Sequence, residues 1–370
     1  MRILLSPDKF KGSLSAVQAC EAMARGLRHV FGEKHELTIC PIADGGEGTT
    51  EALVTALSAE WITITVKDAI GRPIEVRYGL TSDGTAVMEM SAASGLAKVS
   101  DMPLIPESAS TFGTGQMILD AMQRGAKKVI IGIGGSATND GGIGMAQALG
   151  FRFLDARGFE VVDVPAHFDV VQSIVPTTLS MPEVMVACDV DNPLLGEHGA
   201  TRVYGAQKGV TDFELMEHRL WWLNELVTRD LGVSHAEKPG AGAAGGLGFG
   251  LMSFCGGRLV NGFDLIAEVL ALEARIMASD VVITGEGRLD VQTLHGKGPA
   301  GVAALARKHG KRAVAIAGAV GDSQAVRDLF DHALAIKPAS MPLAEAMERG
   351  AELIEEMVVQ HAEVFRGLGL

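Results

Sequence analysis

Short apolar runs alternate with amphipathic segments near both ends of the chain. Residues 3–5 predict a buried strand, and the loop after it leads to Ser15, where Gln18 completes the capping box of a helix. The apolar positions of that helix recur at helical spacing. Residues 37–42 predict the next strand, which ends in a glycine turn and a second helix. Strand, glycine turn and helix in alternation indicate parallel βαβ units.

The pattern changes after residue 60. Residues 61–67 alternate apolar and polar positions, and the segments at 74–80 and 85–90 flank the turn sequence TSDG, which predicts a β-hairpin. Three further elements follow: strands at 128–133 and 184–188, and a helix at 211–231. Antiparallel strands inside a βαβ chain indicate an inserted domain.

The βαβ rhythm resumes near residue 275. Residues 280–284 predict a strand that leads into the loop GEGRLD, and residues 299–308 predict a helix. We therefore expect an α/β fold in which a Rossmann-like discontinuous domain, residues 1–60 plus 275–370, carries an inserted second α/β domain of mixed sheet, residues 61–274.

Composition excludes several classes of partner. The chain has 370 residues and a formal net charge of -13, which argues against binding to nucleic acid or to an anionic membrane. We find no apolar run of about 20 residues that could span a membrane, and we expect no signal peptide. The four cysteines form no CxxC pair, so we expect reduced thiols and a cytoplasmic location. The sequence leaves the oligomeric state open, a homodimer included.

Glycine is abundant, at 46 residues, and it clusters. A glycine loop before a helix exposes backbone N–H groups at the positive end of the helix dipole, which favours bound anions. Five segments fit this description: 45–48, 113–115, 132–144, 240–248 and 285–287. No GxxxxGK[ST] motif occurs, so an ordinary P-loop enzyme is not expected.

The sequence GIGGSA, which begins at Gly132, also fits a dinucleotide-binding fingerprint. It follows a predicted strand, and Asp155 lies about twenty residues further on. In that fingerprint, however, the helix begins at the third small residue, whereas here helical character begins only near Ile143. An NAD-dependent oxidoreductase therefore stays an alternative.

Two acids follow the buried strand at 184–188. Asp189 and Asp191 would face the same side of an extended segment, where they could hold Mg²⁺ or accept a proton. The alternative is an Asx turn closed by Pro193. We predict Asp189 as the general base, because the strand supports it rigidly, and Asp191 as the metal ligand.

Other acids compete for the role of base, namely Asp44, Asp140 and Asp290. Asp44 and Asp140 precede glycine turns, where they could cap the next helix. Asp290 could pair with Arg288. Basic residues in glycine-flanked loops could neutralise phosphate charge: Lys9, Lys11, Lys208, Arg288 and Lys297.

Eight motifs occur in one order along the chain: SPDKFKGSLSA, PIADGGEGT, GTG, GIGGSATNDGG, ACDVDNPLLGEHGA, YGAQKG, PGAGAAGGLG and TGEGRLDVQTLHGK. Together they closely resemble the bacterial glycerate kinases that make 2-phosphoglycerate. The resemblance covers essentially the whole chain. It implies ATP-dependent phosphorylation of D-glycerate with Mg²⁺, and an active site in the cleft between a Rossmann-like and a second α/β domain. One position departs from the family, since Lys9 stands where members often have Ser or Thr.

These motifs give an expected site. The catalytic candidates are Asp189, Arg288 and Lys297, and the metal candidate is Asp191. The expected substrate- and phosphate-binding residues are Asp8, Lys9, Lys11, Asp44, Gly45, Gly46, Gly134, Gly135, Ser136, Asn139, Asp140, Gly285, Glu286 and Gly287. A non-catalytic ligand-binding protein is a further alternative, because two domains also suit that role.

Overall fold

The computed structural model describes residues 1–43, 45–295 and 298–369. Two compact units make up the chain. The first consists of Met1–Asp44, Glu51–Ser58 and Phe263–Leu370, and the second of Gly45–Thr50 and Ala59–Gly262. Residues 263–274, which we placed in the insertion, belong to the first unit.

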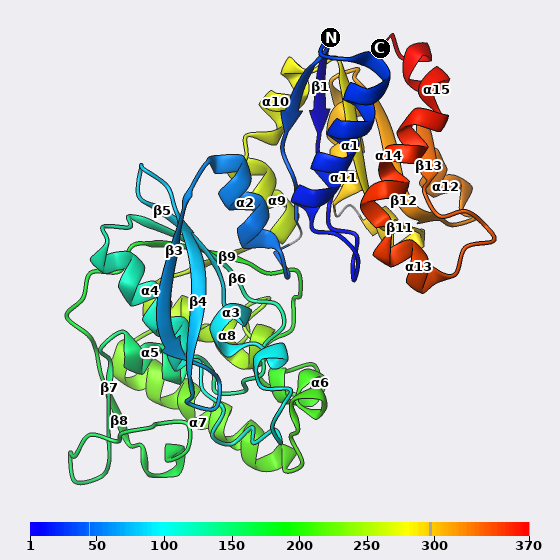
Figure 1. The fold of residues 1–370 in the computed structure, drawn as a ribbon. Coiled ribbons are helices and arrows are strands. Elements are labelled where there is room, and N and C mark those ends of the chain that lie inside the picture. Colours follow the sequence, from blue (N-terminus) through cyan, green and yellow to red (C-terminus); the bar gives the residue numbers. More distant parts are fainter. Residues whose placement is uncertain (44, 296–297, 370) are drawn as a thin grey trace. The chain divides into compact units, whose positions relative to one another are not determined.

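A parallel sheet forms the centre of the first unit (Figure 1). Its strands in spatial order are β13 (His332–Ala335), β12 (Arg312–Val320), β11 (Val281–Leu289), β1 (Arg2–Leu5) and β2 (Glu36–Ile39). All four pairings are parallel. The order reverses between β1 and β11, as in flavodoxin-like doubly wound sheets and unlike that of dinucleotide-binding Rossmann domains. Ligands of such sheets bind at the carboxyl ends of the strands beside this switch point.

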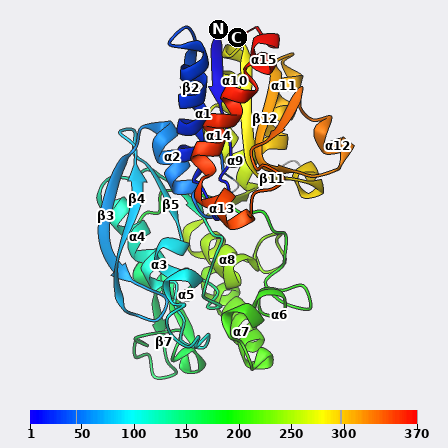
Figure 2. The same ribbon diagram turned by 45° about the vertical axis from the view of Figure 1, so that its right-hand side comes forward.

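Helices lie on both faces of this sheet and beside it. They are α1 (Ala16–Phe31), α9 (Gly262–Val269), α10 (Leu272–Ala278), α11 (Pro299–Lys308), α12 (Gln324–Arg327), α13 (Leu343–Glu348), α14 (Gly350–Gln360) and α15 (Ala362–Gly367), with a 3₁₀ turn at Val291–His295. The predicted capping box of α1 is present, because Ser15 Oγ accepts from the Gln18 N–H and Gln18 Oε1 accepts from the Ser15 N–H. Helices α1 and α14 lie side by side on one face, and α11 lies on the other (Figures 1 and 2).

A mixed sheet forms the centre of the second unit. Its strands in spatial order are β10 (Arg258–Val260), β9 (Glu183–Ala187), β6 (Lys128–Gly132), β5 (Thr85–Glu89), β4 (Pro73–Leu80) and β3 (Glu60–Lys67). The first four run parallel, whereas β5, β4 and β3 pair antiparallel. The hairpin predicted from TSDG is therefore confirmed. A separate pair, β7 (Arg152–Leu154) and β8 (Ser173–Val175), is antiparallel.

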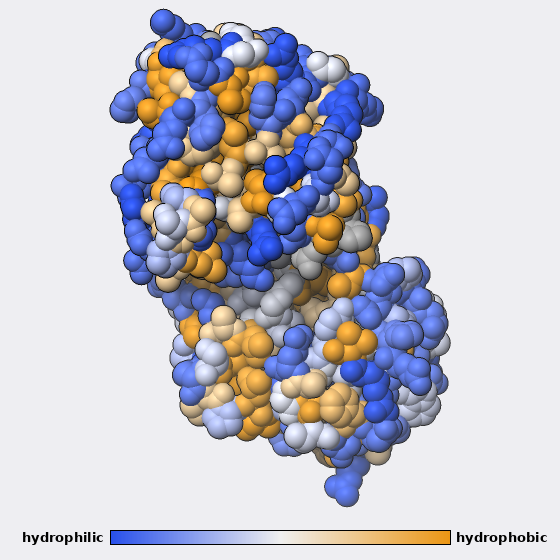
Figure 3. Space-filling view, turned by 90° about the vertical axis from the view of Figure 1, so that its right-hand side faces the viewer, coloured by the Kyte–Doolittle hydropathy of each residue, from blue (hydrophilic) through white to orange (hydrophobic). Residues whose placement is uncertain are grey.

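The second unit contains most of the remaining helices. These are α3 (Ser91–Ser94), α4 (Phe112–Gln123), α5 (Ile143–Ala148), α6 (Ala200–Tyr204), α7 (Phe213–Leu231) and α8 (Ala243–Cys255), with 3₁₀ turns at Leu96–Lys98, Phe168–Val170 and Ala206–Lys208. Helix α2 (Thr49–Leu57) follows the first glycine turn, as predicted. In the described part of the chain, no helix combines the length and apolarity needed to cross a membrane. Hydrophilic residues predominate on the face shown in Figure 3, with hydrophobic residues in smaller patches between them.

Three of the five predicted glycine loops are instead parts of regular elements. Gly113 and Gly115 lie inside α4, and residues 285–287 lie inside β11. Residues 243–248 form the start of α8, in which Ala244 to Gly246 have left-handed backbone angles. A Cβ at Gly245 would overlap the carbonyl oxygen of Thr138. Close backbone packing explains the glycine at these positions.

Candidate active site

The loop after β1 lies against β11 at the switch point of the first unit. The Asp8 N–H donates to the Gly285 carbonyl oxygen (2.8 Å), and Asp8 Oδ1 accepts from the Lys9 N–H (2.6 Å). A Cβ at Gly287 would lie 3.2 Å from the backbone nitrogen of Lys11. The absence of a side chain at Gly287 therefore allows the loop after β1 to pack closely against β11. The fold thus brings together residues of two motifs that are far apart in sequence.

Residues 285–289 of the motif GEGRLD belong to strand β11 rather than to the loop that we predicted. Gly285 pairs with Ile316 of β12, and a Cβ at Gly285 would overlap the carbonyl oxygen of Ile316. Glu286 accepts a hydrogen bond from Thr293 Oγ1 (2.8 Å). Arg288 is 72% exposed and forms an ion pair with Asp290 (3.2 Å), the pairing that the sequence had suggested for Asp290.

Two predicted site residues, Asp44 and Lys297, lie outside the described residues. Gly298, which has a φ of 51°, directly precedes α11. A Cβ at Gly298 would lie 3.1 Å from Asp8 Oδ2, so the start of α11 adjoins the loop after β1.

A second group of candidates lies at the carboxyl ends of the parallel strands of the second unit. Gly45 has a φ of 86°, and a Cβ there would lie 2.7 Å from the Cβ of Ala187, at the end of β9. A Cβ at Gly134 would lie 3.4 Å from the Cα of Gly46. The turn at 45–46 therefore packs directly against the segments that follow β6 and β9.

Asp189 is the second residue after β9 and is half-buried. Its Oδ1 accepts from Asn261 Nδ2 and from the Gly262 N–H, both at 2.9 Å. Gly262 is the first residue of α9, so this carboxylate is fixed at a helix N-terminus. Asp191 is exposed.

The described carboxylates of this region do not form a complete set of protein ligands for a metal ion. Within the ranges that the structure describes, no group of three or more His, Cys, Asp or Glu residues is placed to hold a metal ion. Magnesium in kinases, however, commonly takes one or two carboxylates together with water and substrate phosphates. The exposed Asp191 fits that mode.

Glu89, at the end of β5, is a candidate that the sequence analysis missed. Its Oε1 accepts from the Thr50 N–H (2.8 Å) in the first turn of α2, and its Oε2 accepts from Ser91 Oγ (3.4 Å). A carboxylate at the end of a predicted strand was the available signal, the same one that selected Asp189. Asn261 was also missed, since its role depends on a partner 72 residues away.

The loop after β6 presents two exposed glycines, Gly134 and Gly135, and then turns inward. The Gly135 carbonyl oxygen accepts from the Leu96 N–H (2.9 Å). The side chain of Ser136 is buried, and its Oγ donates to the Ala244 carbonyl oxygen (3.1 Å). The glycine part of this loop is therefore accessible to a ligand.

Lys208 supports this loop from inside the unit. The residue is 2% exposed, and its Nζ donates to the Thr138 carbonyl oxygen (2.6 Å) and to Ser136 Oγ (3.1 Å). Burial lowers the pKa of Lys208 to about 7, and the charge of Asp140 acts in the opposite direction. The sequence had marked Lys208 only as a glycine-flanked lysine.

Asp140 is a structural carboxylate in the same network. It accepts hydrogen bonds from the N–H and Oγ1 of Thr111 (both 2.8 Å) and from the N–H groups of Gly142 (3.1 Å) and Gly144 (3.2 Å). Burial raises the pKa of Asp140 despite these bonds. With both oxygens engaged and 8% of the residue exposed, Asp140 holds the loop in shape, and its predicted role in phosphate binding stays a prediction.

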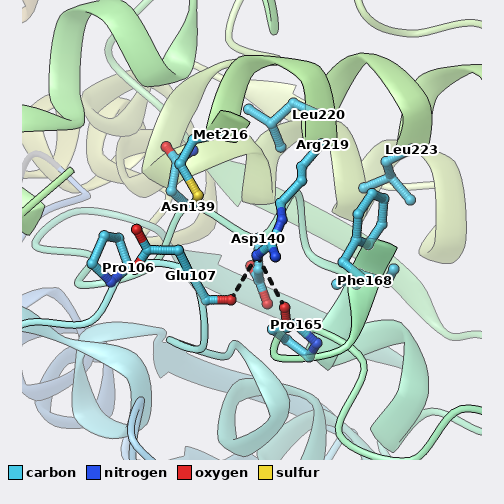
Figure 4. A pocket seen from close by; sticks show the side chains of 11 residues that line it. Pro106, Glu107, Asn139, Asp140, Pro165, Phe168, Met216, Arg219, Leu220 and Leu223 are labelled. Atoms are coloured by element: carbon cyan, nitrogen blue, oxygen red, sulfur yellow. Dashed lines mark hydrogen bonds between the residues drawn. The ribbon is translucent and has the colours of Figure 1, made fainter. Parts of the chain in front are cut away.

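Asn139 is also buried, at 1% exposure. Its Nδ2 donates to Thr201 Oγ1 (3.0 Å), while Oδ1 has no partner within the described residues. Asn139 and Asp140 line a cavity of about 20 Å³, beside which Arg219 donates to the carbonyl oxygens of Glu107 and Pro165 (Figure 4). This volume suits one water molecule and is too small for glycerate.

The GIGGSA motif does not form a dinucleotide-binding turn. After β6 the chain continues through an irregular loop, and α5 begins only at Ile143. In the fingerprint the helix N-terminus would directly follow the glycines and bind the pyrophosphate. The structure therefore gives no support to the NAD-dependent alternative.

Comparisons with known proteins agree with the motif order. A model of the glycerate kinase family matches residues 3–366. The chain belongs to the glycerate kinase family. It is 43% identical over 368 residues to glycerate kinase from Halalkalibacterium halodurans, covering 96% of this chain and 95% of that protein. It is 41% identical over 333 residues to glycerate 2-kinase from Escherichia coli, covering 88% of this chain and 87% of the relative.

A solved structure supports the same conclusion. The chain superposes with a TM-score of 0.90 and 38% identity on a crystal structure assigned as glycerate kinase 2 from Salmonella typhimurium LT2, with 100% of both chains covered. The α/β class, with parallel and mixed sheets, is thereby confirmed. Membership in the glycerate kinase family also confirms the resemblance read from the motifs, and it makes the chain a phosphotransferase.

Proposed function

We propose that this protein transfers the γ-phosphoryl group of ATP to the 2-hydroxyl group of D-glycerate, giving 2-phosphoglycerate and ADP. The observation that carries the proposal is the match to the glycerate kinase family over residues 3–366. Relatives named glycerate kinase or glycerate 2-kinase, at 41–43% identity, support it.

The reaction needs a base, a held acceptor and neutralised phosphate charge. The hydroxyl oxygen of glycerate bonds to the γ-phosphorus while the bond from that phosphorus to the β,γ-bridging oxygen breaks. ADP leaves, and the hydroxyl proton passes to a carboxylate and then to solvent. Most of the catalysis is positioning and electrostatic stabilisation, which backbone N–H groups and a few cations can supply.

Asp189 is our candidate for the base. The hydrogen bonds from Asn261 and Gly262 fix one carboxylate oxygen, which supports a defined position for the other. It also lies two residues after the end of β9, at the end of the sheet where α/β proteins bind ligands. Glu89, fixed at the start of α2, has a similar setting and is the rival within this unit.

The glycine turns at 45–46 and 134–135 are our candidates for binding the carboxylate or phosphate oxygens of the substrates. They adjoin one another at the same sheet edge as Asp189, which supports a joint role. In the first unit, the phosphate-binding candidates are Asp8, Lys9, Lys11, Glu286, Arg288 and Lys297, with Gly285 and Gly287 as close-approach positions in β11. Asp44 stays a prediction.

Asp191, together with ATP phosphates, would hold Mg²⁺, which when bound neutralises part of the phosphate charge. Its exposed carboxylate supplies the hard oxygen ligand that this ion prefers.

The test is a turnover assay with D-glycerate and Mg·ATP, in which ADP release gives the rate and phosphorus NMR identifies the product. We expect 2-phosphoglycerate as the product, and no ADP release above background when glycerate is omitted. Formation of 3-phosphoglycerate would contradict the regiochemistry, and the absence of any phosphorylated product would contradict the proposal as a whole.

A further inference from the structure

Three helices of the first unit enclose a groove with a volume of about 770 Å³. Helices α9, α10 and α11 each contribute small side chains to it, such as Ala267, Ala274 and Ala304. We call it the α9–α11 groove. Its volume lies within the range of pockets that bind cofactors and drug-sized molecules, and far exceeds the size of glycerate.

Apolar side chains line the groove, although the ring of Phe263 is only 6% exposed. A Cβ at Gly301 would overlap the ring of Phe263, so the missing side chain lets this ring lie directly against α11. Met277 is 55% exposed on the opposite helix, α10. An exposed thioether makes favourable contacts with aromatic rings. These features suit a planar heteroaromatic ligand.

Carboxylates form the rim of the groove. Glu273 already accepts from Lys308 Nζ and lies within hydrogen-bond distance of His309 Nε2, both at 2.7 Å, and these partners hold its pKa below the usual value. Asp264 and Glu268 are exposed. Ionised carboxylates accept hydrogen bonds from N–H and O–H groups and repel anions. The rim therefore disfavours glycerate and favours an uncharged ring system with amino and hydroxyl donors.

One end of the groove opens toward a place suited to phosphate. Ala300 and Gly301, in the first turn of the ten-residue helix α11, line this end. A helix N-terminus favours negative charge, and the carboxylate of Asp8 already lies beside this one, at the switch point of the sheet. A nucleotide could thus leave its base and sugar in the groove and extend its phosphates beyond it.

We propose that the α9–α11 groove binds the adenosine part of the phosphoryl donor. The exocyclic amino group and the ribose hydroxyls then donate to rim carboxylates, and the purine ring lies against Met277 and the small side chains of the groove, such as Ala267 and Ala304. This inference rests on ATP being the donor in the proposed function.

Photolabelling with 8-azido-ATP tests the location directly, without any dependence on turnover. After irradiation of the whole chain and digestion, mass spectrometry should place the adduct within residues 263–278 or 300–305. Excess ATP should suppress the adduct, and excess D-glycerate should not. An ATP-suppressible adduct confined to other segments would overturn the inference.

Substitution of a groove residue by a larger one gives a second test, in which the KM for ATP is measured. Ala274→Phe places a ring in the groove, whereas Ala278→Phe places the same ring on an exposed position four residues further along α10. We expect the first variant to raise the KM for ATP by at least about tenfold with the KM for D-glycerate unchanged, and the second to match the wild type. Circular dichroism checks that both variants fold. Equal ATP KM values for the two folded variants would refute the inference.

These outcomes separate the inference from the proposed function. If 8-azido-ATP labels the groove in an ATP-suppressible manner but glycerate is not phosphorylated, the inference is supported and the proposed function is contradicted. If glycerate is phosphorylated but the label lies in other segments, the proposed function is supported and the inference is contradicted. If Ala274→Phe changes only the molar mass measured by light scattering, the groove is an interface between copies of the chain and the inference is wrong.

Discussion

Replacing Lys208 with methionine should change how the stability of the second unit depends on pH. Lys208 is buried, and its Nζ donates to Thr138 and Ser136. Burial lowers the pKa of its amine from the ordinary 10.5 to about 7. Over the range between these values, the unfolded chain holds a proton that the folded chain has released. Methionine has a similar length and no amine to titrate.

The sign and size of the effect follow from proton linkage. Below about pH 7 both states of wild-type protein hold the proton, so this group adds no pH dependence. Above pH 7 and up to 10.5 the unfolded state binds more protons, so the free energy of unfolding rises with pH, by at most about 1.4 kcal/mol per pH unit. We expect a gain of about 2 kcal/mol between pH 7 and pH 9 in the wild type. Lys208→Met should lack this gain.

Tryptophan fluorescence during urea unfolding is the assay, because all three tryptophans, at positions 61, 221 and 222, lie in the second unit. The variant also loses hydrogen bonds to the loop, which should shift its stability similarly at both pH values and leave the difference intact. Lys98→Met, at an exposed lysine of the same unit, is the matched control and should keep the wild-type pH dependence. If Lys208→Met and the wild type gain stability equally between pH 7 and pH 9, the buried amine does not titrate in this range and the reasoning fails.

Three further predictions concern the same unit. Asp189→Asn should lower kcat about 10²–10⁴-fold and leave the KM for glycerate nearly unchanged. Asp191→Asn should mainly raise the Mg²⁺ concentration needed for half-maximal rate. The reverse pattern in steady-state kinetics would exchange the two roles. Asp140→Asn should destabilise the unit by roughly 3 kcal/mol in the urea assay, because an amide group would face backbone N–H donors, and an unchanged midpoint would contradict this. Gly245→Ala should reduce the soluble yield or lower the urea midpoint, because its Cβ would overlap the carbonyl oxygen of Thr138, and a wild-type midpoint would contradict the predicted overlap.

Local features of the fold could be predicted from the sequence because their partners are near in the chain. The capping box joins Ser15 and Gln18, three residues apart, and the TSDG turn joins adjacent strands. The extension of β11 through residues 285–289 could not be predicted in this way. It depends on pairing with β12, and its glycines also suit a loop. A glycine inside a strand often marks close backbone approach, which the sequence alone does not distinguish from a turn.

In the candidate site, too, the sequence predicted local features but not contacts between residues that are far apart in the chain. Asp189 could be selected because its position after a buried strand is a local signal. Lys208 could not be assigned a role, since Ser136 is 72 residues away in sequence and its burial depends on the whole unit. We predicted a phosphate-binding role for Asp140 because its hydrogen-bond partners could not be recognised from the sequence. Its anchoring partner, Thr111, lies on a separate segment that the sequence does not connect to it.

The distribution of glycines narrows the search for the anion-binding loops. A glycine is required wherever backbone approaches closely, whether the neighbour is a ligand or the protein itself. At Gly113, Gly245 and Gly285 the neighbour is a carbonyl oxygen of this chain, so protein packing already explains the residue. Gly134 and Gly135, in contrast, are exposed at the carboxyl end of β6, on a loop whose interior is held by Lys208. A rigid support beneath exposed backbone is what preorganised anion binding needs, so this turn, with Gly45 and Gly46 beside it, is where the proposed transfer chemistry is best supported.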